Sequence, residues 1–100
     1  MKKIKDLADK IMDEVCDAKE YGEKYIEEKV SGNSTVANKY KEMASDELKH
    51  AGYLHEIAVG EINKIKSSGI KYPESMEERW KVLHAEYVDK AAWVKQILTL

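Results

Sequence analysis

The sequence predicts an all-α protein: a single domain, residues 1–100, folded as an antiparallel three-helix bundle. Apolar residues recur at intervals of three and four in three long segments, as on the buried face of a helix. Two short polar connections separate these segments, so neighbouring helices should run antiparallel. No segment alternates with the period of a strand. A chain of 100 residues buries only a modest core.

The first predicted helix covers residues 3–31. It ends where Ser31, Gly32 and Asn33 interrupt the apolar pattern. Gly32 suits the left-handed conformation that follows many helices, and Asn33 or Ser34 suits the cap of the next one. The apolar positions of this helix are Ile4, Leu7, Ala8, Ile11, Val15, Ala18, Gly22, Tyr25 and Ile26.

The second predicted helix covers residues 35–67. Its apolar face is assigned to Val36, Tyr40, Met43, Ala44, Ala51, Leu54, Ala58, Ile62 and Ile65.

The third predicted helix covers residues 74–99. Pro73 suits a first helical turn, and Ser75 and Glu78 have the spacing of a capping box. Trp93 falls off the apolar stripe and is a candidate for contact with another chain. The stripe itself is assigned to Met76, Trp80, Leu83, Tyr87, Ala91, Val94 and Leu98.

Charge and composition argue against several classes of protein. Basic and acidic residues number 17 and 19, and Arg79 is the one arginine, so no nucleic-acid partner is expected. No apolar run approaches the roughly 18 residues of a membrane span, so no membrane partner is expected either. Cys16 is the single cysteine and the N-terminus lacks the apolar core of a secretory signal, which together predict a cytoplasmic protein.

Polar residues on the apolar faces are the most informative feature. On a helical wheel Glu47 falls at the centre of the apolar face of the second helix, and His50 falls at its edge. Glu14 points inward from the first helix. Carboxylates are almost never buried unless they are paired or bind a metal. The three residues lie at similar heights in an antiparallel hairpin, and two carboxylates with one imidazole suit iron, manganese or sometimes zinc.

The same residues resemble a known family. Glu47 and His50 form a Glu-x-x-His motif, and Glu14 is followed one heptad later by Tyr21. This pattern is similar to that of the ferritin-like, rubrerythrin-like di-iron carboxylate superfamily over residues 4–66, and the layout resembles small bacterial or phage-type members. The resemblance implies that Glu14 and Glu47 ligate or bridge iron, that His50 is a terminal ligand, and that the chemistry is oxidase- or ferroxidase-like.

The family pattern is only half present. A complete di-iron site needs a second Glu and a second Glu-x-x-His from two more helices. At the corresponding height the third helix reads Ala-Ala-Trp-Val-Lys over residues 91–95, which supplies no acidic ligand. Either the site is mononuclear, or a homodimer or higher homo-oligomer brings two copies of Glu14, Glu47 and His50 together across a two-fold axis. The symmetric dimer is the preferred hypothesis.

Three further residues are weaker candidates for additional metal ligands: Asp17, His55 and His84. His55 and His84 lie nearly level across the second turn and would otherwise form a hydrogen-bonded pair.

The competing function is a non-catalytic helical oligomerisation or interaction module, such as a phage or mobile-element accessory protein. In that case the inward Glu and His side chains form a polar specificity cluster without metal.

Overall fold

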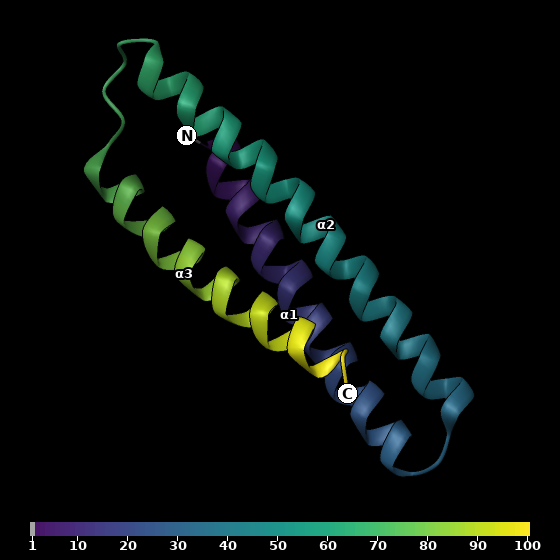
Figure 1. Ribbon diagram of the computed structural model, residues 1–100. Coiled ribbons are helices and arrows are strands. Elements are labelled where there is room, and N and C mark those ends of the chain that lie inside the picture. Colours follow the sequence, from purple (N-terminus) through teal and green to yellow (C-terminus); the bar gives the residue numbers. More distant parts are fainter. Residues whose placement is uncertain (1) are drawn as a thin grey trace.

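The computed structural model describes residues 2–100 and contains three helices (Figure 1). They are α1 (Lys2–Val30), α2 (Ser34–Ser67) and α3 (Glu74–Ile97), and no strand occurs in the described range. The predicted bounds differ from these by no more than two residues at any end, and the predicted helical bundle is confirmed. The bundle is elongated, measuring 57 × 19 × 17 Å. None of the described helices has the length and apolar character required to cross a membrane.

The helix ends follow local backbone chemistry. Gly32 and Gly69 have φ values of 84° and 82°, a conformation that glycine adopts without steric cost. Asn33 stands at the start of α2, but its side chain caps no backbone amide and donates instead to Oε2 of Glu28 at 2.8 Å. The capping box predicted at Ser75 is wrong, because α3 begins one residue earlier, directly after Pro73.

The contact between α1 and α2 is built on a repeat of alanines. Four alanines, which we call the alanine seam, repeat every seven residues along α2, and each is at most 2% exposed. Short side chains let two helices approach closely. The seam packs on α1, where Ala18 lies with Ala44 and Val15 lies with Ala51. The members of the alanine seam are Ala37, Ala44, Ala51 and Ala58.

This seam corrects the predicted face of α2. Val36 and Met43 were assigned to the core, yet they are 45% and 40% exposed. Ala37, which the apolar stripe omitted, is buried in place of Val36. The buried face is therefore rotated by about one residue at this end of α2, because alanines fit the narrow interface and larger side chains do not.

The third helix packs unevenly along its length. It lies mainly on α1, and its fully buried residues are Ala91 and Val94, both near its C-terminal end. Trp93 is half-buried against the cluster formed by Ala18, Ala44 and Val94. Trp93 therefore packs partly within its own bundle, and its contact with another chain stays a prediction.

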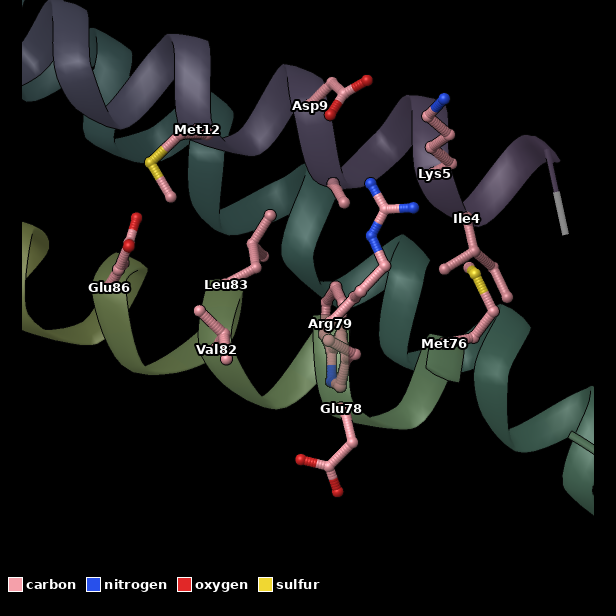
Figure 2. Close-up of a pocket in the computed structure, with 12 residues that line it drawn as sticks. Ile4, Lys5, Asp9, Met12, Met76, Glu78, Arg79, Val82, Leu83 and Glu86 are labelled. Carbon is pink, nitrogen blue, oxygen red and sulfur yellow. The ribbon is translucent and has the colours of Figure 1, made fainter. Parts of the chain in front are cut away.

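A groove of about 470 Å³ separates the N-terminal halves of α1 and α3. Its floor is apolar, with Met12, Met76 and Leu83 among the lining residues. Figure 2 shows Arg79 reaching from α3 toward α1 across this groove, whereas Glu78 points away. The two helices thus share a core at one end of the molecule and stand apart at the other.

Candidate metal centre

Glu14 of α1 and Glu47 and His50 of α2 meet at one point on the surface of the hairpin. Each offers one ligand atom, and these atoms all lie within 4.8 Å of one another. Among the described residues, this is the one group of three or more His, Cys, Asp or Glu side chains with such geometry. We refer to Glu14, Glu47 and His50 as the carboxylate cluster.

The alanine seam explains why these side chains converge. Glu47 lies between Ala44 and Ala51 in the sequence, and Glu14 directly precedes Val15, which packs with Ala51. The short side chains of the seam bring the two helices close enough for carboxylates on opposite helices to meet. The antiparallel hairpin thus places a residue near the middle of α1 beside one near the middle of α2.

Within the carboxylate cluster, burial decreases from Glu14 on α1 to His50 on α2. The side chains of Glu14, Glu47 and His50 are 13%, 22% and 55% exposed, respectively. Glu47 was predicted at the centre of the buried face, and this is wrong, because the alanine seam occupies the centre and Glu47 lies at its edge. The cluster is therefore anchored on the hairpin but open to solvent on the side of His50.

The two carboxyl groups share a proton. A hydrogen bond to Glu14, together with burial and the charge of Glu14, raises the pKa of Glu47 to about 7. The pKa of Glu14 is lowered, chiefly because its carboxylate accepts that hydrogen bond from Glu47. Like charges held close together cannot both ionise cheaply. At neutral pH the pair therefore carries less than its full negative charge, and a cation could take the place of the proton.

Lys10 belongs to the surroundings of the cluster and was missed in the sequence. Its Nζ lies 3.3 Å from Oε1 of Glu14, one helical turn away, and it helps to lower the pKa of Glu14. The spacing of four residues between Lys10 and Glu14 is the pattern that could have identified it. Asp17, a weaker candidate ligand, lies outside the cluster, although its charge contributes to the raised pKa of Glu47.

His50 faces both carboxylates without bonding closely to either. Its Nδ1 lies 3.8 Å from Oε2 of Glu14 and 3.7 Å from Oε1 of Glu47. These distances exceed those of a normal hydrogen bond. Three potential ligand atoms thus surround a common point, and the imidazole is bonded closely to neither carboxylate, an arrangement that a divalent cation with oxygen and nitrogen ligands would complete.

His55 and His84, the other weaker candidates, do not join the carboxylate cluster. They form a separate histidine pair between α2 and α3, with His55 Nε2 and His84 Nδ1 2.9 Å apart. This distance is that of a hydrogen bond, so one ring donates and the other accepts. The predicted pairing across the second turn is confirmed, but only His55 is partly buried, whereas His84 is exposed.

The tyrosine one heptad after Glu14 also lies on the hairpin interface. The rings of Tyr21 and Tyr40 stack with their centroids 6.3 Å apart, and both side chains are half-buried. Tyr21 packs against the cluster of Ala18, Ala44 and Val94. This packing accounts for the two rings as part of the α1–α2 interface.

Comparison with known proteins assigns no family to this chain: no protein-family model, no curated protein and no solved structure matches it significantly. The function of the chain therefore has to be inferred from the chemistry of its own residues, above all from the two carboxylates and the imidazole that the α1–α2 hairpin brings together.

Proposed function

We propose that this chain is a metal-binding, ferritin-like protein that holds iron, or alternatively manganese or zinc, with Glu14, Glu47 and His50. The observation that carries the proposal is the convergence of three ligand atoms within 4.8 Å from two helices. Carboxylate oxygens and an imidazole nitrogen suit these metals. Bound iron would supply redox chemistry toward oxygen or peroxide, as in the ferroxidase-like reactions that the family resemblance implies.

The protonation of the cluster supports the fit to a cation. The pKa of Glu47 is raised to about 7 because Glu14 lies beside it, so the pair is under electrostatic tension whenever both groups are ionised. A divalent cation relieves that repulsion and displaces the shared proton. Lys10 is the nearby basic side chain, and at 60% exposure it can turn away into solvent when a cation arrives.

We further propose that two copies of the chain complete the site. Three protein ligands leave coordination positions open, and His50 is the member that faces outward, 55% exposed. A two-fold axis next to His50 would bring four carboxylates and two imidazoles together, the set that the di-iron carboxylate proteins use.

An exposed apolar surface surrounds His50 and supports the same arrangement. Val36, Met43 and Ile57 flank His50 at steps of seven residues along α2 and are 45%, 40% and 49% exposed; Tyr53, on the same side, is 62% exposed. Apolar residues at heptad spacing on one side of a helix form the seam of a helix–helix contact. We refer to Val36, Met43, Tyr53 and Ile57 as the α2 stripe. A second copy docked through the α2 stripe would cover the open side of the carboxylate cluster.

Metal analysis of untagged protein tests the proposal. The chain is produced with iron or manganese supplementation, and its metal content and its mass by light scattering are measured. We expect stoichiometric metal and a dimer. Glu47→Ala and His50→Ala should lose the metal, whereas Glu42→Ala, a change at an exposed glutamate on the same helix, should retain it. Absence of metal from the wild-type protein after supplementation would refute the metal site.

The competing function is a helical interaction module without metal, and the α2 stripe is the observation that favours it. In that case the chain associates through the stripe, and the carboxylate cluster is a polar group at the interface. Glu47→Ala then becomes neutral or stabilising, because it removes a poorly solvated carboxylate.

For either function we place the protein in the cytoplasm, since its single cysteine, Cys16, is free and exposed.

A further inference from the structure

The N-terminal half of α3 is held to the bundle by few contacts. No residue between Glu74 and Lys90 is fully buried, and the groove separates this half from α1. Among the described residues, two side-chain hydrogen bonds join α2 to α3: the histidine pair and the bond from Lys66 to Glu77. The second is a surface ion pair, and pairs of this kind contribute little. The histidine pair is therefore the principal polar link.

The ring of His55 is the centre of a small aromatic cluster that reaches across to α3. Its centroid lies 5.5 Å from that of Trp80, 5.0 Å from that of His84 and 4.9 Å from that of Tyr87. The ring of His55 stacks with those of Trp80 and Tyr87. His55 is thus fixed in orientation by three residues of α3, and its Nε2 is aimed at His84.

The hydrogen bond between the two rings depends on their protonation. One facing nitrogen must carry a hydrogen and the other must offer a lone pair. A first added proton can be taken up on the outer nitrogen of the donor ring, so the bond survives with one positive charge. A second proton places hydrogens on both facing nitrogens and leaves two positive rings in contact, so the bond is lost and the rings repel.

We propose that His55 and His84 act as a pH-sensitive latch, which holds the N-terminal half of α3 on α2 and releases it when both rings are protonated. Release would move Trp80 and Tyr87 away from α2 and widen the groove, whose lining includes Met12, Met76 and Leu83. Acidification would thereby expose apolar surface that is partly covered at neutral pH, independently of the carboxylate cluster.

The surroundings of the latch place its release below neutral pH. Burial and the charge of His84 lower the pKa of His55, and only Glu56, on the same helix, opposes this. From α3 the phenol of Tyr87 also faces the ring, and burial raises its pKa, so it stays neutral. Among the described residues, no charged group of α1 acts on His55. Because the folded state disfavours the proton, the latch weakens as pH falls below the ordinary histidine value of 6.5.

Amide hydrogen exchange of the whole untagged chain tests the latch. Protection of residues 74–87 is compared with that of residues 88–97 and of α1 and α2, at several pH values and after correction for intrinsic exchange. We expect protection of residues 74–87 to fall by up to about tenfold for each pH unit below the second protonation, with a smaller change elsewhere. In His84→Phe, which keeps a flat ring but takes up no proton, two positive rings can no longer face each other and this selective loss should become much smaller.

A titration of the imidazole resonances by NMR provides a second readout that needs no variant. The latch requires His55 and His84 to protonate in two separated steps, with the change in residues 74–87 following the second step. It is overturned if both rings titrate independently at the ordinary value, if residues 74–87 keep their protection after both steps, or if His84→Phe shows the same selective loss as the wild type.

Discussion

The two interfaces of the bundle differ in how they are built. Between α1 and α2, the alanine seam allows close packing along the length of the hairpin, and Ile11 and Val15 are fully buried there. In the N-terminal half of α3, side chains are at most half-buried and a groove remains beside α1. Each interface carries one polar cluster that contains histidine. The carboxylate cluster lies on the tightly packed α1–α2 hairpin, and the histidine pair links α2 to the loosely packed half of α3.

The difference in packing suits the carboxylate cluster to ligand binding and the histidine pair to switching. The carboxylate cluster lies on a tightly packed hairpin that fixes its geometry, but the imidazole of His50 is bonded closely to neither carboxylate, as in a site awaiting a ligand. The histidine pair satisfies itself at 2.9 Å, but it joins elements that are otherwise loosely held. Ligand atoms on a rigid hairpin, with an imidazole that is not yet bonded, favour metal binding, whereas a hydrogen-bonded histidine pair between loosely packed helices favours switching.

The largest expected effect tests the difference in packing. Ile11→Ala removes a fully buried side chain from α1 and should lower the free energy of unfolding by about 3 kcal/mol. Leu83→Ala removes a half-buried side chain from the groove of α3 and should cost only about 1 kcal/mol. Urea unfolding of both variants measures the difference. Equal costs would mean that α3 is packed as firmly as the hairpin.

The next largest effect is on metal affinity, which should depend on the carboxylate cluster and not on the histidine pair. Glu47→Ala should weaken binding of ferrous or manganous ion by about 100-fold or more, because it removes one of three ligands. His84→Phe should leave that affinity unchanged, since the hydrogen-bond partner of His84 is His55 and not a member of the carboxylate cluster. Competition titration with a chelating dye measures both. A matching loss in His84→Phe would show that the histidine pair belongs to the metal site after all.

A smaller effect concerns the shared proton of the carboxylate cluster. The pKa of Glu47 is raised from 4.5 to about 7, so the folded chain binds more protons than the unfolded chain between these values, and metal-free protein should lose stability as pH rises through this window. Glu47→Gln removes the repulsion and should be more stable than wild type above pH 7 by on the order of 1 kcal/mol. Unfolding in a chelator at about pH 5 and pH 8 checks this; an unchanged pH dependence in Glu47→Gln would argue against the shared proton.

The smallest effect is expected at the second link between α2 and α3. Lys66 Nζ lies 3.1 Å from Oε2 of Glu77, but the side chains are 47% and 30% exposed. Lys66→Ala should therefore change the free energy of unfolding by about 0.5 kcal/mol or less, and any change should vanish in high salt. A larger, salt-resistant loss would show that the histidine pair is not the principal link.

Much of the fold could be predicted because helix formation and helix ends are local. The periodicity of three and four, with Gly32 and Pro73 at the connections, places every helix end within two residues. The convergence of Glu14, Glu47 and His50 could also be predicted, because a short turn forces antiparallel packing and the heights of residues on the two helices are then set by counting.

What the sequence by itself determined is therefore the set of helices, their antiparallel hairpin and the residues that meet on it. Only the tertiary structure decided which of two adjacent stripes of α2 is buried, because Ala37 and Val36 are both apolar and the choice depends on how closely α1 approaches. It likewise decided that Trp93 packs inward and that the N-terminal half of α3 stands away from α1. These outcomes depend on the fit between side chains distant in the sequence, which periodicity along a single helix does not contain.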